Sequence, residues 1–131
     1  MASRTAQQAS GALGEDRALA YLLEQGLKLI ARNVLLNPGR SQRSGELDLV
    51  MTEGATVVFV EVRARGSSLG ATQFGGAIAS LSPQKIARLT RAAQTWLQRD
   101  KVYRHHPPLC RIDAILIDGD QPLQWLKNIT G

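Results

Sequence analysis

Residues 46–65, ELDLVMTEGATVVFVEVRAR, decide the fold, because two alternating stretches flank a short turn-forming segment. Apolar and polar side chains alternate over 46–52 and again over 56–64, which predicts two β-strands. Between them, residues 53–55 include a glycine and supply a tight turn. We therefore expect a β-hairpin at the centre of the molecule.

The hairpin places two carboxylates against each other. A turn symmetric about Gly54 and Ala55 sets Asp48 opposite Glu61. Two carboxylates about 5 Å apart repel by about 1 kcal/mol in water and by more at a lower dielectric constant, a cost that a bound divalent cation would remove. Mg²⁺ prefers carboxylate oxygens together with water and phosphate. The residues expected on this face are Glu46, Asp48, Glu61 and Arg63.

The same hairpin has a second interpretation, as the solvated face of an edge hairpin. In that arrangement Arg63 would bridge Glu46, and the other two carboxylates would be exposed to water. A loop with an odd number of residues would also shift the register and separate the pair.

A further carboxylate belongs to the first predicted helix, residues 12–25. Glu15 lies inside the apolar stripe of this helix, where unpaired burial would cost several kcal/mol. A metal ion or a basic partner would remove that cost. The alternatives are a salt bridge to a nearby arginine and exposure near the helix N-terminus, where the helix dipole favours a carboxylate. The stripe consists of Ala12, Ala18, Leu19, Leu22 and Leu23, and Gly26 ends it.

The other segments complete an α/β pattern. They are a flexible lead-in (1–10), a strand (27–36), a glycine-rich loop with room for a short helical turn (66–80), a helix with Ser82 as N-cap and Pro83 as its first residue, a strand (109–117) and a short strand (123–129). The order α-β-β-β-α-β(β) predicts a single domain over 11–131, built on a mixed sheet flanked by helices. The second helix permits a parallel crossover.

Composition limits the classes of partner and compartment. Sixteen Lys and Arg against eleven Asp and Glu give a formal charge of +5, which suits a polyanion such as nucleic acid but also simple solubility. The single cysteine, Cys110, excludes an intrachain disulfide. The sequence has neither a signal-peptide pattern nor an apolar run of about 18 residues, so we expect a cytoplasmic protein without a membrane partner.

Five segments resemble the YraN family of small bacterial proteins, over nearly the whole chain. They are Gly11-x-x-Gly14-Glu15-x-x-Ala18, GELDLV (45–50), VFVEVR (58–63), Ser82-Pro83-x-Lys85 followed by Arg88-Leu89, and CRIDA (110–114). That family is similar to the restriction-endonuclease-like PD-(D/E)xK superfamily, particularly to Holliday-junction resolvases. The resemblance implies a restriction-endonuclease-like fold in which Glu15, Asp48 and Glu61 bind Mg²⁺ or Mn²⁺. It also implies an endonuclease-like role on DNA, including branched DNA.

One position departs from the PD-(D/E)xK pattern, because Arg63 stands where lysine is expected. Arginine stays charged and cannot readily serve as a base, although it can stabilise negative charge on a phosphate. Lys85 could supply the missing amine, or could be an ordinary exposed helix lysine. The expected catalytic residues are therefore Asp48, Glu61, Arg63 and Lys85, and whether the protein is an enzyme stays open.

Several weaker signals stay ambiguous. Asp113 lies inside an apolar strand and would either make structural hydrogen bonds or contribute to the candidate site. His105 and His106 diverge in an extended chain and fit an exposed loop better than a metal site. Trp96 fits the core, whereas Trp125 would pack in the core or stack on a base. The basic residues expected to flank the site, as phosphate contacts or as solvated side chains, are Arg40, Arg43, Arg63, Arg65 and Lys85.

Three function classes follow. The leading hypothesis is a Mg²⁺-dependent endonuclease, for which a homodimer would suit symmetric cutting of two strands. The second is a nucleic-acid-binding module that has lost catalysis through the change at Arg63. The third, a protein-interaction module with a merely acidic surface, is favoured least.

Overall fold

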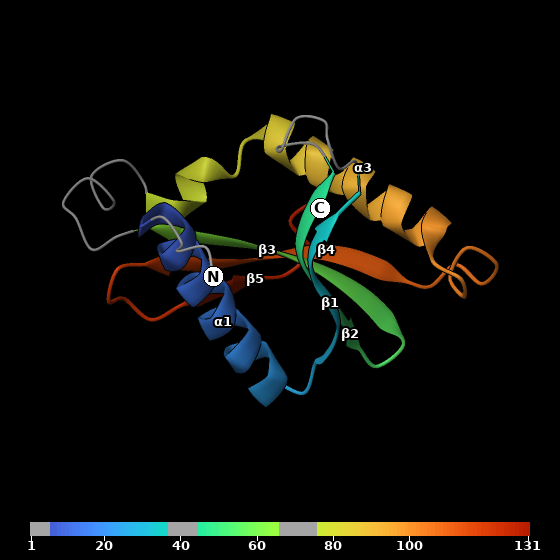
Figure 1. Cartoon of the computed structure of the whole chain (residues 1–131), viewed down its shortest axis with the longest axis horizontal. Coiled ribbons are helices and arrows are strands. Elements are labelled where there is room, and N and C mark those ends of the chain that lie inside the picture. The colour runs from blue at the N-terminus through green and yellow to red at the C-terminus, as the bar shows by residue number, and fades with distance from the viewer. Residues whose placement is uncertain (1–5, 37–44, 66–75) are drawn as a thin grey trace, which may run out of the picture.

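The centre of the fold is a five-stranded mixed sheet whose strands lie side by side in chain order (Figure 1). This computed structural model describes residues 6–36, 45–65 and 76–131. The strands are β1 (Lys28–Leu35), β2 (Glu46–Glu53), β3 (Thr56–Arg65), β4 (Cys110–Asp118) and β5 (Gln124–Leu126). Among these described strands, only the β3–β4 pair is parallel, as the predicted crossover permits. The predicted single-domain α/β architecture is confirmed.

The central hairpin has the predicted even register. Glu53 pairs with Thr56, so the loop contains only Gly54 and Ala55. Gly54 has a φ of +59°, which the first central position of a type II′ turn requires and which glycine adopts without steric cost. The alternative of an odd loop is thereby excluded.

The helices begin and end close to the predicted residues, with one clear difference. Helix α1 (Ala6–Glu24) begins six residues before the predicted start, because the alanines and glutamines of this segment favour helix without contributing to an apolar stripe. Half of the expected lead-in is therefore helical, and residues 1–5 lie outside the described part. Helix α3 (Pro83–Arg99) has Ser82 as its N-cap, as predicted. No helix in the described ranges combines the length and apolar character needed to cross a membrane.

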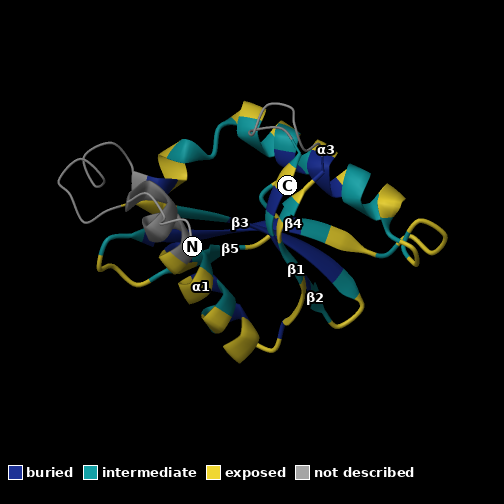
Figure 2. Cartoon of the chain, in the orientation of Figure 1, coloured by how far each residue is buried: buried dark blue, intermediate teal, exposed yellow. Residues whose placement is uncertain are grey.

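Two hydrophobic layers hold the helices on opposite faces of the sheet (Figure 1). Ala18 and Leu22 of α1 pack against Val58 and Val60 of β3. On the other face, Leu89, Ala92 and Ala93 of α3 pack with Phe59. Figure 2 shows that buried residues concentrate on the central strands between the helices. A short 3₁₀ helix, η1 (Gly76–Ser80), forms within the predicted glycine-rich loop and precedes α3, while residues 66–75 lie outside the described part.

The sheet forks on one side of the hairpin. Pairing between β2 and β3 extends from the turn only to Leu49 and Val60. Beyond that point β2 stays paired with β1 as far as Glu46, and β3 stays paired with β4 as far as Arg65. The strands β2 and β3 therefore separate at the next residue of each strand, which is Asp48 in β2 and Glu61 in β3.

Candidate functional site

Asp48 and Glu61 meet at this fork in the sheet. They are the next residues in register after the last pair of the β2–β3 ladder, Leu49 and Val60. Asp48 Oδ2 also accepts a hydrogen bond of 2.9 Å from the backbone N–H of Val62. That N–H belongs to the edge of β3 that β2 has left, so the aspartate side chain replaces a backbone partner. The predicted opposition of the two residues is confirmed.

Burial gives this pair unusual electrostatics. The Glu61 side chain is only 4% exposed, so the interpretation of both carboxylates as solvated is wrong for this residue. Burial raises the pKa of Asp48 well above its ordinary value, and the hydrogen bond and negative charge of Glu61 raise it further. The Val62 N–H and the positive charge of Lys85 oppose this rise. A proton or a nearby positive charge therefore stabilises the pair.

Lys85 supplies one positive charge from helix α3. Its Nζ lies 3.1 Å from Glu61 Oε2, and its side chain is only 24% exposed. The interpretation of Lys85 as an ordinary exposed lysine is therefore wrong. Lys85 is the third residue of α3, where its backbone N–H donates to the Ser82 side chain at 3.1 Å. A cation in the first turn opposes the helix dipole, and Glu61 compensates for it.

Arg63 contacts a residue that the sequence did not indicate. Its Nε donates a hydrogen bond of 2.7 Å to Ser80 Oγ in η1. No ion pair between Arg63 and Glu46 forms among the described residues, so the bridge proposed for a solvated hairpin is wrong. Ser80 was not identified from the sequence, because a serine in a glycine-rich loop carries no local signal for a partner on a distant strand.

Glu15 approaches the pair from helix α1. Gly14 makes this possible, because a Cβ there would lie 3.0 Å from the Ala64 Cβ on β3. The Glu15 side chain is 18% exposed, and burial followed by the negative charge of Asp48 raises its pKa to about 7. Arg32 on β1 opposes this rise from 3.7 Å, but it lies closer, at 2.8 Å, to Asp16. The alternative of a salt bridge between Glu15 and an arginine is therefore present, but the contact is long and Arg32 lies closer to Asp16.

A fourth carboxylate, Glu46, borders the group. It is more exposed than the others, and partial desolvation followed by the charge of Asp48 raises its pKa, while Lys85 opposes the rise. The negative charge of Asp48 raises the pKa values of Glu15 and Glu46, and the negative charge of Glu61 raises that of Asp48, so the carboxyl groups of Glu15, Glu46, Asp48 and Glu61 form a single acidic cluster. We call these four residues the acidic cluster.

The donor set fits a hard divalent cation. Carboxylate oxygens are the ligands that Mg²⁺ and Mn²⁺ prefer. Glu61 Oε2 is buried and accepts no hydrogen bond of good geometry, although Lys85 lies nearby. Within the described ranges, no three His, Cys, Asp or Glu side chains have the spacing of a complete metal cage. Asp48 and Glu61 would hold such an ion together with water and phosphate oxygens, with Glu15 close by.

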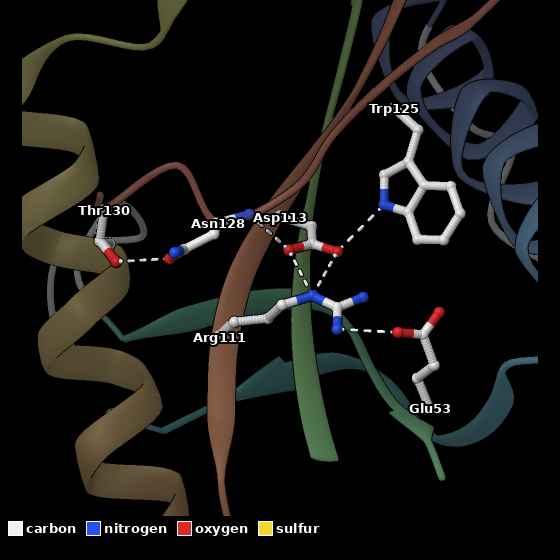
Figure 3. Close-up of polar contacts among 6 residues, drawn as sticks. All are labelled: Glu53, Arg111, Asp113, Trp125, Asn128 and Thr130. Carbon is white, nitrogen blue, oxygen red and sulfur yellow. Dashed lines mark hydrogen bonds and ion pairs between the residues drawn. The ribbon is translucent and has the colours of Figure 1, made fainter.

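Asp113 belongs to a separate buried network (Figure 3). It is fully buried and accepts hydrogen bonds from Arg111 Nε, from Trp125 Nε1 at 3.0 Å and from the Asn128 backbone N–H at 2.9 Å. Arg111 in turn pairs with Glu53 at 2.8 Å. The network ties β4 to β5 and to the C-terminal residues, so the hydrogen-bonding interpretation of Asp113 holds.

The other weak signals are also placed. His105 and His106 are exposed, as the loop interpretation requires. Trp96 packs edge to face with Phe59 at 5.8 Å, in the core. Trp125 packs against the α1 face and lies edge to face with Tyr21 at 6.1 Å, in addition to its bond to Asp113. Arg65 is exposed at the end of β3, whereas Arg40 and Arg43 lie outside the described residues.

Comparisons with known proteins assign the chain to a family. The family model described as "Uncharacterised protein family UPF0102" matches residues 14–117. A UPF0102 protein of Herminiimonas arsenicoxydans is 49% identical over 125 residues, which cover 95% of this chain and 89% of the relative. A UPF0102 protein of Neisseria gonorrhoeae is 42% identical over 121 residues, which cover 92% of this chain and 94% of the relative. The chain therefore belongs to the UPF0102 family, the restriction-endonuclease-like YraN family that its motifs resemble.

Proposed function

We propose that this protein is a Mg²⁺- or Mn²⁺-dependent endonuclease that acts on DNA. The observation that carries the proposal is the Asp48–Glu61 pair at the fork of the sheet, in which Glu61 is buried and lies 3.1 Å from the Lys85 amine. Structural ion pairs are usually built from one acid and one base. In the acidic cluster, burial and neighbouring negative charge raise the pKa values of Glu15, Glu46 and Asp48, which destabilises the fold and is typical of a site kept for its chemistry.

Each residue has a distinct role in this proposal. Asp48 and Glu61 would hold the metal ion, and Glu15 would complete or extend the site. The metal, when bound, would supply a Lewis acid for the phosphodiester and lower the pKa of an attacking water. Lys85 would stand where the amine of the E-x-K pattern is needed, and would orient that water or stabilise charge on the scissile phosphate.

The charge distribution on α3 supports a nucleic-acid substrate. This helix carries four basic residues and no acidic residue over Pro83–Arg99. Lys85 is the first of them, so the basic helix begins at the acidic cluster. Lys and Arg side chains that contact phosphates position a nucleic acid without reading its sequence. The basic residues of α3 are Lys85, Arg88, Arg91 and Arg99.

A second candidate function is nucleic-acid binding without cleavage on the same scaffold. It is favoured by the hydrogen bond from Arg63 to Ser80, which directs the residue at the E-x-K lysine position toward a structural partner. This candidate predicts salt-sensitive DNA binding that does not depend on the acidic cluster.

A cleavage assay separates the two candidates. Single-stranded, duplex, flap and four-way-junction DNA are incubated with wild-type protein in Mg²⁺, Mn²⁺ or EDTA. Asp48→Asn is the test variant, and Thr130→Ala, an exposed change beside the C-terminus, is the matched control. We expect metal-dependent cleavage that Asp48→Asn reduces by about 100-fold or more, as loss of a transition-state contact does. Binding to DNA without cleavage under any metal would leave only the second candidate.

A further inference from the structure

We propose that Arg63 is a positioning residue, which acts through Ser80 to hold Lys85 against Glu61 and does not contact the substrate. The mechanical part of this inference stands on the contacts alone. Its consequence for cleavage rests on the proposed nuclease function.

The first contact joins β3 to the 3₁₀ helix. Arg63 is two residues after Glu61, so both side chains project to the α3 face of the sheet. Arg63 Nε donates to Ser80 Oγ at 2.7 Å, and Ser80 Oγ donates to the Ala77 carbonyl at 2.6 Å. The serine hydroxyl therefore has a defined donor and a defined acceptor, and cannot rotate without losing both.

A second contact fixes η1 from the neighbouring strand. The Ala77 N–H donates to Asp118 Oδ1 at 2.7 Å, at the end of β4. Ala77 itself is fully buried against Ala114 and Leu116 of the same strand. The 3₁₀ helix is thus held by β3 through Arg63 and by β4 through Asp118, which leaves its last residue, Ser80, in a fixed position over the sheet.

The chain then leads directly from Ser80 to Lys85. Ser82 caps α3, and its side chain accepts from the Lys85 N–H itself at 3.1 Å. The Lys85 side chain returns to β3 and ends 3.1 Å from Glu61 Oε2. These contacts form a closed circuit. Arg63 is bonded to Ser80, the chain continues from Ser80 to Lys85 through the Ser82 cap, and Lys85 contacts Glu61, two residues before Arg63.

The circuit explains why arginine suits this position. The flexible Lys85 side chain loses considerable rotamer entropy when it is held in place. Its positive charge also lies in the first turn of α3, where it opposes the helix dipole. An independent anchor for the start of α3 would offset both effects. Arginine provides one because its planar guanidinium stays charged and presents Nε in a fixed direction, whereas a lysine amine presents no such fixed donor. A relocated amine at Lys85 and an anchoring arginine at position 63 are then two parts of one arrangement.

The test observes Lys85 directly, in the absence of metal and DNA. The chain has four lysines, so NMR of protein labelled with ¹³C and ¹⁵N in lysine gives few signals. The Lys85 signal is assigned by its loss in Lys85→Gln, and Lys28 and Lys101, which are exposed, provide the reference for a free side chain. The variants are Ser80→Ala and Arg63→Gln, each of which breaks the first contact from one side. Ser80→Thr, which keeps the hydroxyl, and Thr130→Ala are the controls.

We expect a Lys85 signal distinct from the two reference lysines in the wild type and in both controls. In Ser80→Ala and Arg63→Gln it should shift most of the way to the reference position, while the amide spectrum stays folded. A folded Ser80→Ala protein with an unchanged Lys85 signal would overturn the proposal. If Ser80→Ala does not fold, Ser80→Cys, which keeps the size of the side chain and weakens the acceptor, is subject to the same criterion.

Cleavage provides the second readout. Displacement of Lys85 should lower the cleavage rate of Ser80→Ala and Arg63→Gln alike, by about 10- to 100-fold, as small misplacements of catalytic groups do. If Arg63→Gln were inactive while Ser80→Ala kept full activity, Arg63 would contact the substrate and the proposal would be wrong. Absence of cleavage in the wild type would count against the nuclease function alone, since the NMR result does not depend on it.

Discussion

Lys85 Nζ lies 3.1 Å from Glu61 Oε2, so an amine from the first turn of α3 neutralises part of the acidic cluster. The same amine would also repel a divalent cation bound by Glu61. The two roles oppose each other, because a group that helps the chemistry weakens binding of the metal. This opposition makes Lys85 the most informative single position in the site.

Replacement of Lys85 should therefore separate metal binding from catalysis. We expect Lys85→Gln to strengthen Mn²⁺ binding by about tenfold, which corresponds to removal of roughly 1.4 kcal/mol of charge repulsion. Cleavage should fall by about 100-fold or more, since an amine that orients the reacting groups is lost. Isothermal titration calorimetry and the junction-cleavage assay measure the two effects. Weaker metal binding in Lys85→Gln would contradict the proposed repulsion.

Asp48→Asn should stabilise the metal-free protein above neutral pH. Burial and Glu61 raise the pKa of Asp48, so ionisation of this group destabilises the folded state as pH rises. Asparagine removes that charge and still accepts the hydrogen bond from Val62. Thermal unfolding followed by circular dichroism at pH 5 and pH 8, in EDTA, tests this. The melting temperature should rise more at pH 8 than at pH 5, and a lower value at pH 8 would contradict the prediction.

The raised pKa of Glu15 fixes a pH window for stability. A folded-state pKa of about 7 against an ordinary value of 4.5 means that the folded protein binds more protons between these values. This contribution is therefore present below pH 4.5 and is lost as pH rises through about 7. Urea unfolding of the metal-free protein at several pH values should show this decline in wild type and a shallower one in Glu15→Gln. If the free energy of unfolding declined equally with pH in wild type and in Glu15→Gln, Glu15 would not be the responsible group.

Gly14 should be essential for the placement of α1. A Cβ there would meet the Ala64 Cβ at 3.0 Å, and neither atom can rotate away. Gly14→Ala should gain about 1 kcal/mol of helix propensity but lose more through displacement of α1, which we expect to be a net destabilisation of about 1 kcal/mol. Metal binding should weaken because Glu15 is the next residue. The double variant Gly14→Ala with Ala64→Gly should restore metal affinity, and failure to do so would exclude a simple steric cause.

Asp113 should affect stability without affecting the metal. Asp113→Ala leaves the Trp125 N–H without its partner and leaves the partly buried Arg111 guanidinium with Glu53 alone, which costs about 3 kcal/mol. Chemical denaturation, followed by tryptophan fluorescence, measures this loss. Mn²⁺ affinity of the folded fraction should be unchanged. A large loss of metal affinity in folded Asp113→Ala would show that this network extends to the site.

The hairpin and its acidic pair could be predicted from local sequence. Alternation sets the faces of β2 and β3, and Gly54 in a two-residue loop leaves one register, so Asp48 had to lie opposite Glu61. The cap at Ser82 was equally local, because a serine followed by proline satisfies the first turn of a helix from neighbouring residues. The start of α1 was missed, since propensity extends a helix beyond its apolar stripe.

By itself, the sequence determined the strands, the register and the identity of the carboxylates, because each depends on neighbours within a few residues. Only the tertiary structure decided what those groups contact. The fork between β2 and β3, the pairing of Lys85 with Glu61 and the hydrogen bond from Arg63 to Ser80 join segments 14 to 24 residues apart. Such contacts follow from how helices pack on the sheet, and that packing depends on the summed burial of both hydrophobic layers. For this reason the sequence identified Arg63 as a departure from a pattern, and the fold assigned it a partner.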